Sequence, residues 1–287
     1  MGGGTVRKWP VANNTGDASI PEGVDISRPS SARLYDYYLG GTHNFPVDRQ
    51  AAERIRQVMP DLGDAAWANR GFHQRAATWI ARQGITQFLD LGSGLPTQGN
   101  THEVVRKHDA DARVVYVDLD PMVAAYSEHL IDDPERTTVI TADMRDPDAV
   151  LGHPQMERLI DTSRPVGVLM TAVVHFVSDE SDPWSLVRRY MDALAPGSYL
   201  ALSHVTYERL PTTAVSAGRE EYQRSSEPIF LRSQAEIERL FDGLEIVPPY
   251  PGAAASVCHV GLWGAEDPES ADSEGSRVFF CAVGRKL

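Results

Sequence analysis

The sequence has few cysteines, no histidine cluster of metal-ligand type and no long apolar run. Its 287 residues include only Cys258 and Cys281, which are too few for a disulfide framework or a cysteine metal site. The nine histidines show no ligand spacing such as His-Glu-x-x-His, so we expect no metal. The longest apolar run, residues 165–174, is well short of the ~20 residues of a membrane helix, so no membrane partner is expected.

Cationic side chains are also in the minority. Lys and Arg number 27 against 40 Asp and Glu, which gives a net charge of -13. Such a field repels phosphate backbones, and we therefore expect no nucleic-acid partner. Residues 1–14 contain no hydrophobic signal-peptide core, so the expected location is cytoplasmic. What remains is an acidic globular protein that acts on something small.

The first eighty residues have a helical pattern. Residues 1–28 show no apolar periodicity and are expected to be a flexible N-terminal lead or a strap over the surface. Three amphipathic helices follow: one from Ser30 or Ser31 to the Gly40-Gly41 pair, one over 47–58 and one from Phe72 to near Gly84. We interpret residues 29–83 as a helical cap over an active site.

Beyond residue 84, short apolar runs alternate with helical segments, which is typical of a parallel sheet built from βαβ units. We therefore predict an α/β fold: a Rossmann-like, seven-stranded, mostly parallel sheet over residues 84–287 with helices on both faces, covered by the N-terminal helical cap. Only residues 205–231 do not fit the alternation. The predicted strands cover residues 87–91, 113–117, 137–141, 166–170, 198–205, 244–247 and 277–283.

Ligands of such sheets bind beyond the carboxyl ends of the strands. The first predicted strand runs into Asp90-Leu91-Gly92-Ser93-Gly94, where two glycines allow a backbone to pass close beneath a ligand. A dinucleotide fingerprint needs a third glycine at position 97, but this chain has Thr97 after Pro96. This departure speaks against a nicotinamide cofactor. A tight turn without a ligand is the alternative for the glycine pair.

Acidic residues follow the second and third predicted strands. Asp118 lies about 20 residues past the glycine loop, where a carboxylate can accept hydrogen bonds from a ribose diol. Asp120 is explained by a helix cap. Asp143 can accept from an exocyclic amine, and Met144 can lie against a purine face. A turn position is the alternative role for Asp143.

In this order, the glycine loop, the acid and the Ala-Asp-Met sequence at 142–144 resemble the class I S-adenosylmethionine-dependent methyltransferases. The resemblance implies that residues 90–94 lie against the methionine part of the cofactor. It also implies that Asp118, with Leu119 beside it, binds the ribose and that Asp143 and Met144 flank the adenine. The segment after the fourth predicted strand, including Ala172, would then lie beneath the cofactor and beside the acceptor.

A narrower resemblance covers most of the chain. The sequence Ser-Ser-Ala-Arg-Leu-Tyr-Asp-Tyr-Tyr-Leu-Gly-Gly-Thr-His-Asn-Phe at 30–45, with Asn-Arg-Gly-Phe at 69–72 and the loop at 91–97, is similar to the bacterial S-adenosyl methyltransferase family. Membership implies the fold and S-adenosylmethionine as cofactor, but it fixes no acceptor.

The cap concentrates polar and aromatic residues around its glycine turn, a composition found in pockets. We name Arg33, Tyr35, Tyr38, Asn44 and Arg70 as candidate substrate-binding residues. Arg33 or Arg70 can also pair with the cofactor carboxylate. Helix caps and solvated faces use the same residue types, so a purely structural role is the alternative for each.

Methyl transfer from a sulfonium is an in-line displacement, which requires alignment and exclusion of water and no protein nucleophile. If the acceptor is a hydroxyl or an amine, a base must take its proton. His175, beyond the fourth predicted strand, is the first candidate, and His204, at the end of the fifth, is the second. A buried histidine without a chemical role is the alternative for both.

The sequence thus predicts an enzyme that methylates a small-molecule acceptor on oxygen or nitrogen. A module that binds S-adenosylmethionine without catalysis is the first alternative, because no base is positively identified. A nicotinamide-dependent oxidoreductase is the second. The sequence does not distinguish a monomer from a homodimer.

Overall fold

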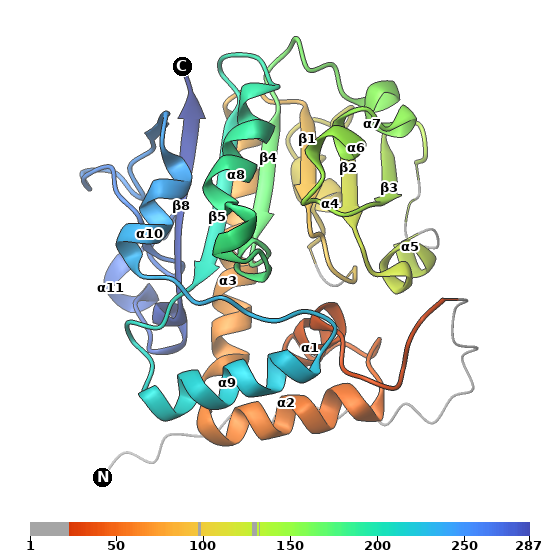
Figure 1. Cartoon of the computed structure of the whole chain (residues 1–287). Coiled ribbons are helices and arrows are strands. Elements are labelled where there is room, and N and C mark those ends of the chain that lie inside the picture. Colours follow the sequence, from red (N-terminus) through yellow and green to blue (C-terminus); the bar gives the residue numbers. More distant parts are fainter. Residues whose placement is uncertain (1–22, 97–98, 128–130, 132) are drawn as a thin grey trace.

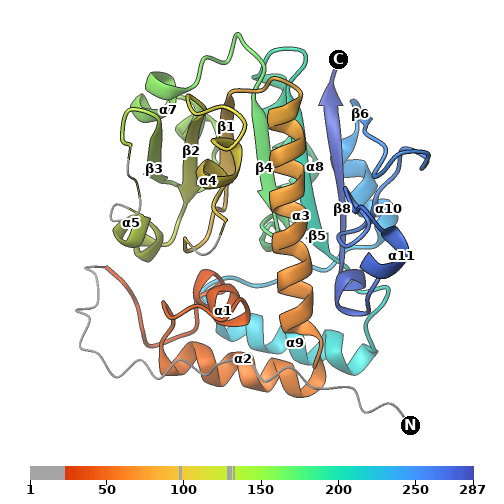
Figure 2. The ribbon, with the colours of Figure 1, turned by 180° about the vertical axis from the view of Figure 1, so that it is seen from behind.

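The sheet lies at the centre of the molecule and carries helices on both faces (Figures 1 and 2). The computed structural model describes residues 23–96, 99–127, 131 and 133–287. Over these residues the strand order is β3-β2-β1-β4-β5-β8-β6, with β7 paired to β8. The predicted α/β fold with a mostly parallel sheet is confirmed, and each of the seven predicted strands is present.

Five strands run parallel, namely β1 (Gln87–Leu91), β2 (Arg113–Asp118), β3 (Thr137–Thr141), β4 (Gly167–Thr171) and β5 (Tyr199–Val205). Strand β8 (Phe279–Lys286) is antiparallel to β5, and β6 (Leu244–Ile246) and β7 (Cys258–His259) are antiparallel to β8. The last predicted strand begins two residues late, because Arg277 and Val278 belong to the short 3-10 helix Gly275–Val278. Strand β7 has only two residues, too few for a recognisable alternation.

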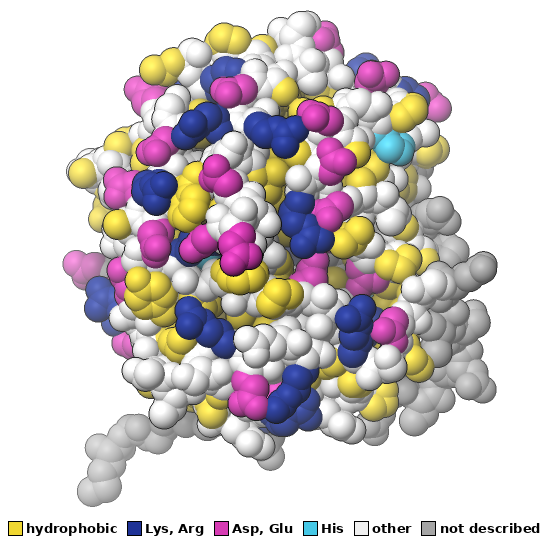
Figure 3. Space-filling model, in the orientation of Figure 1, with side chains coloured by type: hydrophobic (Ala, Val, Ile, Leu, Met, Phe, Trp, Pro, Cys, Tyr) yellow, Lys and Arg dark blue, Asp and Glu magenta, His cyan; other side chains and the backbone are white. Residues whose placement is uncertain are grey.

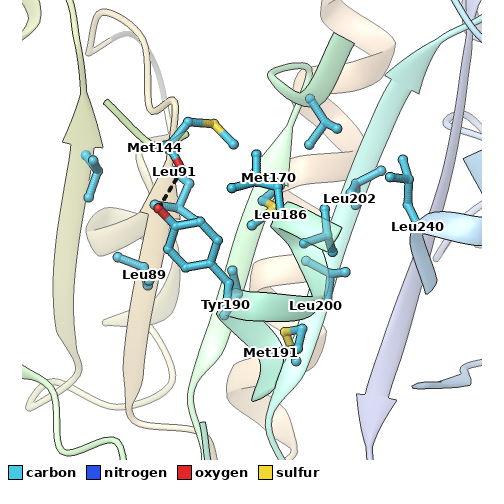
Figure 4. Packing of buried hydrophobic residues seen from close by; sticks show 14 of the residues in the cluster. Leu89, Leu91, Met144, Met170, Leu186, Tyr190, Met191, Leu200, Leu202 and Leu240 are labelled. Atoms are coloured by element: carbon cyan, nitrogen blue, oxygen red, sulfur yellow. Dashed lines mark hydrogen bonds between the residues drawn. The ribbon is translucent and has the colours of Figure 1, made fainter. Parts of the chain in front are cut away.

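The two faces of the sheet bury separate hydrophobic clusters. Helices α6 (Pro147–Leu151), α7 (Pro154–Leu159), α8 (Pro183–Asp192) and α10 (Gln234–Glu238) pack on one face. Figure 4 shows this cluster around Tyr190 of α8. Helices α3 (Leu62–Arg82) and α4 (Thr101–Val105) pack on the other face. The described residues also form two short helices, α5 (Pro121–Ser127) and α11 (Pro268–Ala271).

Hydrogen bonds fix the starts of four of these helices. The Asn100 amide donates to Glu103 Oε2 at 2.7 Å in the capping box of α4. Asp146, Asp182 and Ser233 each accept from the backbone amide three residues on. These bonds satisfy amides that the first helical turn leaves unpaired.

A helical layer lies beneath the carboxyl ends of the parallel strands (Figure 1). It consists of α1 (Ser31–Tyr38), α2 (Pro46–Val58) and α9 (Thr212–Arg224), with the beginning of α3 beside it. Helix α3 begins ten residues before its predicted start, because buried Ala65, Ala66 and Asn69 continue its inner face. Helix α9 lies within residues 205–231, the segment that did not fit the alternation. A β-bridge between Thr206 and Arg232 brings the two ends of this segment together.

The surface carries charged side chains of both signs. Acidic and basic side chains are interspersed over the face that Figure 3 shows. In the described part of the chain, no helix combines the length and the apolar character that crossing a membrane requires.

Candidate active site

A cavity of about 460 Å³ lies between the carboxyl edge of the sheet and the helical layer. It collects loops that follow β1, β2, β3 and β4 together with residues of α1, α2, α3 and α9. Three predicted site residues, Asn44, Asp90 and His204, are not part of its lining. The predicted residues that do line it are Arg33, Tyr35, Tyr38, Arg70, Gly92, Ser93, Gly94, Asp118, Leu119, Asp143, Met144, Ala172 and His175.

The glycine loop after β1 forms one wall of the cavity. Gly92 and Gly94 both have positive φ, at 66° and 65°, which glycine adopts without a steric penalty. A Cβ at Gly92 would meet Val173 Cγ2 at 2.1 Å, whereas a Cβ at Gly94 would have no neighbour within 4 Å. The Ser93 hydroxyl is buried without a hydrogen-bond partner in the described part of the chain. The loop therefore presents backbone and one unsatisfied hydroxyl.

Asp118, at the end of β2, faces the same wall. Its Oδ2 accepts from the Gly94 amide at 2.8 Å, and its Oδ1 accepts from the Asp120 amide at 2.9 Å. Burial raises the pKa of Asp118 to about 6, although these two amides act in the opposite direction. Each carboxylate oxygen keeps a lone pair for a further donor. The side chain can thus accept two hydroxyls without breaking its present bonds.

The turn after β3 is fixed from two sides. Arg145 donates to both oxygens of Asp143, with Nε at 2.8 Å from Oδ1 and Nη2 at 2.7 Å from Oδ2. Burial acts to raise the pKa of Asp143, but the bonds and charge of Arg145 outweigh it and lower that pKa. The Met144 carbonyl accepts from the Tyr190 hydroxyl at 2.8 Å (Figure 4). Helix α8 therefore holds the turn that brings Asp143 and Met144 to the cavity.

Asp90 lies within β1 and is bonded to the protein behind the cavity. Its Oδ2 accepts from the Thr101 hydroxyl at 2.6 Å, so that hydroxyl must itself accept from His73 Nε2 at 2.9 Å. The other His73 nitrogen, Nδ1, then accepts from the Thr171 hydroxyl at 2.9 Å. Burial raises the pKa of Asp90 to about 6. His73 does line the cavity, and sequence reasoning did not single it out.

Two predicted substrate-binding residues hold the cap together. Arg33 is buried, and it donates to Asp48 Oδ2 at 2.8 Å and to the Arg28 carbonyl at 2.7 Å. It thereby fixes residues 23–30 as a strap across the cavity. Asn44 donates to Asp36 Oδ2 at 2.9 Å and lies in the glycine turn, outside the lining. These bonds favour the structural alternative for both residues.

Tyr35 connects the cap to the sheet through a chain of hydrogen bonds. Its hydroxyl accepts from Asn69 Nδ2 at 2.8 Å, and Asn69 Oδ1 accepts from the Ser203 hydroxyl at 2.5 Å. Ser203 Oγ in turn accepts from the Ala172 amide at 3.0 Å. Ala172 has a φ of 56°, a left-handed conformation that costs a non-glycine residue about 1–2 kcal/mol. This chain of bonds therefore supports a strained residue at the cavity wall.

The Ser203→Ala substitution is expected to lower the free energy of unfolding by about 1–3 kcal/mol, because it leaves the buried Asn69 oxygen without its donor. Denaturant unfolding monitored by circular dichroism measures the change. Ser256→Ala is the matched control, since that hydroxyl is exposed and makes one long bond of 3.4 Å, and it should change stability by less than about 0.5 kcal/mol. Equal effects of the two substitutions would contradict this role of Ser203.

The two candidate bases differ in position. His204 is fully buried, with Nε2 accepting from Arg232 Nη1 at 2.7 Å and Nδ1 donating to the Val205 carbonyl at 2.7 Å. Both of its nitrogens are occupied, and this geometry favours the structural alternative. His175 lines the cavity, and its buried Nδ1 has no partner in the described residues. Burial and then the charge of Arg232 lower the pKa of His175 to about 3.

Arg232 organises the segment after β4. It is buried and donates to the carbonyls of Val174 and Val177 and to the carboxylate of Asp179. The 3-10 turn Val174–Phe176, which carries His175, is therefore held by Arg232, the residue that follows the 205–231 segment.

Comparison with known proteins gives the family. A family model described as S-adenosyl methyltransferase matches residues 17–287. The chain belongs to the S-adenosyl methyltransferase family. Its members are S-adenosylmethionine-dependent methyltransferases, so the enzyme class and the cofactor implied by the resemblance are confirmed. The nicotinamide alternative is set aside.

Solved structures agree with this assignment. A candidate methyltransferase of Thermobifida fusca is 40% identical with a TM-score of 0.85, over 94% of this chain and 99% of that one. A DUF574 family protein of Streptomyces avermitilis is 39% identical with a TM-score of 0.83, over 91% and 98%. The plantazolicin methyltransferase BamL, at 8% identity, TM-score 0.50 and coverage of 89% and 96%, shows the fold alone. No curated protein matches the chain.

The 205–231 segment contributes residues to the cavity lining that the sequence analysis did not name. Gly218, Arg219 and Tyr222 of α9 line the cavity, as does Glu227 beyond it. Glu227 Oε2 accepts from the Ser31 hydroxyl at 3.0 Å, and burial raises the pKa of Glu227. The only available signal was the failure of this segment to fit the strand–helix alternation.

Proposed function

We propose that this methyltransferase transfers the methyl group of S-adenosylmethionine to oxygen or nitrogen of a small-molecule acceptor. One observation carries the proposal: a single cavity runs from the glycine loop to an apolar region beneath α9, so donor and acceptor have room in the same space. Helices α1, α2 and α9, with the beginning of α3, act as the cap that closes this space. The volume of the cavity, about 460 Å³, is within the range of small-molecule sites.

The residues at the ends of β1, β2 and β3 fit the cofactor. The open space where a Cβ of Gly94 would lie lets the methionine part approach the backbone there, and the unsatisfied Ser93 hydroxyl is available to its polar groups. Asp118 would accept from the ribose hydroxyls. Met144 would lie against the adenine, with Asp143 beside it. Arg70, which lines the cavity near Asn100, is the remaining candidate for the cofactor carboxylate.

When bound, S-adenosylmethionine would supply an electrophilic methyl group to a lone pair of the acceptor atom. The protein contributes alignment and exclusion of water. Tyr35 and Ala172 are held by the same hydrogen-bond chain, so the wall beside the reacting atoms is rigid. The cap and the strap of residues 23–30 cover this wall from solvent.

The environment of His175 bears on the acceptor atom. With a pKa near 3, its imidazole is neutral at pH 7 and is a weak base. An acceptor that reacts as a neutral amine or as an acidic hydroxyl needs little help with its proton. We therefore assign His175 to orienting such an acceptor through an imidazole nitrogen.

The test has two stages. Calorimetric titration with S-adenosylmethionine, S-adenosylhomocysteine and NAD should show binding of the two sulfur compounds alone. Incubation with methyl-labelled cofactor and a metabolite extract should then give a labelled product of low molecular mass. Label found only in protein or nucleic acid, or in no product, would contradict a small-molecule acceptor.

A further inference from the structure

The cavity extends past the part that the β1–β3 loops line. Its second half lies under β4, β5 and β8, whose ends meet at the same edge of the sheet as the carboxyl ends of the parallel strands. We call this half the acceptor compartment. Its walls are mainly apolar and come from α2, α3, α9 and the sheet edge, with Met59, Leu62, Val205, Leu210, Val215 and Phe279 among the lining residues.

The charged lining residues are distributed unevenly. Asp118, Asp120 and Asp143 belong to the loops after β2 and β3, and Glu227 lies near them beside Arg145. In contrast, the ionisable side chains that line the cavity toward α9 include Tyr35, Tyr38, Tyr222, His73, His175 and the exposed Arg219. Burial raises the pKa of the three tyrosines and lowers that of the two histidines, so these five side chains are neutral at pH 7. A polar or highly charged acceptor would lose its hydration here without compensation.

Tyr38 supplies an unsatisfied polar group. Its side chain lines the cavity and is only 8% exposed, and its hydroxyl has no hydrogen-bond partner in the described part of the chain. A buried hydroxyl without a partner is costly, and a ligand that pairs with it recovers this cost. Together with His175 Nδ1, which also has no partner among the described residues, the Tyr38 hydroxyl gives the mainly apolar wall hydrogen-bonding positions, and such positions determine specificity.

We propose, on the basis of the proposed function, that the acceptor is a mainly apolar molecule with a hydrogen-bonding group that pairs with the Tyr38 hydroxyl. Its apolar part packs between α9 and the sheet edge. This restricts the small-molecule acceptors to predominantly apolar compounds and excludes sugars, polyols and free amino acids.

Gly218 allows the acceptor compartment to be filled selectively. It lies in α9 and lines the cavity, and a Cβ placed there would meet only Met59 Sδ at 3.9 Å, an ordinary contact. The Gly218→Leu side chain would therefore occupy the compartment without backbone strain. Gly218→Ala is the matched control, because it makes the same backbone change and leaves most of the space free.

The probe is N-phenyl-1-naphthylamine, a neutral dye that fluoresces in apolar sites, titrated into protein saturated with S-adenosylhomocysteine. We expect one-to-one binding to the wild type and to Gly218→Ala, and about tenfold weaker binding to Gly218→Leu, with unchanged affinity for S-adenosylhomocysteine. Absence of dye binding to the wild type, or equal binding to Gly218→Leu, would overturn the proposal. Failure of S-adenosylhomocysteine to bind the wild type would instead overturn the proposed function, and this is read out separately.

Tyr38→Phe tests the hydrogen bond. Displacement of the dye by 1-naphthol and by naphthalene should show a preference of the wild type for 1-naphthol, and this preference should fall about fivefold in Tyr38→Phe. The thermal stability of the variant without ligand should not fall, because the hydroxyl has no partner to lose. An unchanged preference for 1-naphthol in Tyr38→Phe, whatever its thermal stability, would overturn the assignment of Tyr38.

Discussion

Asp118→Ala is expected to weaken binding of S-adenosylmethionine and S-adenosylhomocysteine by at least about a hundredfold. The substitution removes two hydrogen bonds from a charged acceptor, each worth about 1.5–3 kcal/mol, and tenfold in affinity corresponds to about 1.4 kcal/mol. Isothermal titration calorimetry at pH 8 measures the loss. A dissociation constant within a few-fold of the wild type would place the ribose elsewhere.

The pH dependence of cofactor binding tests the same assignment of Asp118. Because burial raises the pKa of Asp118 to about 6, lowering the pH through 6 protonates the carboxyl and should weaken cofactor binding. Asp118→Asn should bind weakly without a step at that pH. Asp90, whose pKa is also raised to about 6, is retained in this variant, so a persistent step would assign the titration to Asp90.

The raised pKa of Asp118 also affects the stability of the fold, in the direction opposite to its effect on cofactor affinity. The folded-state pKa of Asp118 lies above its ordinary value of 3.8, so the folded protein holds the proton more tightly than the unfolded chain. The stabilisation from this group is therefore fully present below pH 3.8 and is lost as the pH rises through 6. Cofactor affinity and this contribution to stability change in opposite directions over that interval.

Gly92→Ala is expected to lower the free energy of unfolding by about 2–5 kcal/mol. A left-handed φ costs alanine about 1–2 kcal/mol, and the Cβ contact of 2.1 Å with Val173 adds about 1–3 kcal/mol of overpacking. Gly94→Ala is the matched control: it has the same φ to within a degree but open space around its Cβ, so only the conformational cost applies. Urea unfolding of both variants separates the two effects.

The double variant Gly92→Ala/Val173→Ala sharpens the interpretation. Removal of the Val173 methyl groups should recover the overpacking part and leave the conformational part. If Gly92→Ala and Gly94→Ala were equally destabilised, the contact with Val173 would not be what restricts position 92.

Much of the fold was predictable because its signals are local. The capping box at Asn100 and Glu103 and the strand sequences such as Gln87–Leu91 are short patterns whose physical cause lies within a few residues. The position of Asp118 and the glycine pair at one edge of the sheet was predictable for the same reason, because each follows or ends a strand.

What the sequence did not predict depends on tertiary contacts. Arg33 and Asn44 have the composition of a binding site, but their donors are used by Asp48, Asp36 and backbone carbonyls, which no local pattern indicates. His204 has the position of a candidate base, but Arg232, 28 residues further along the chain, donates a hydrogen bond to its Nε2. Helix α9 packs on α2 and borders the cavity, and no local pattern in residues 212–224 indicates either contact.

The bridge between Thr206 and Arg232 has a consequence for divergence within the family. Because it joins the two ends of the segment that contains α9, the segment leaves and rejoins the sheet at one place, and its length and sequence can change at little cost in loop closure. Helix α9, one wall of the proposed acceptor compartment, is thus attached to the sheet at one place. Exchange of residues 207–231 between relatives should therefore change acceptor preference while the strand order stays the same.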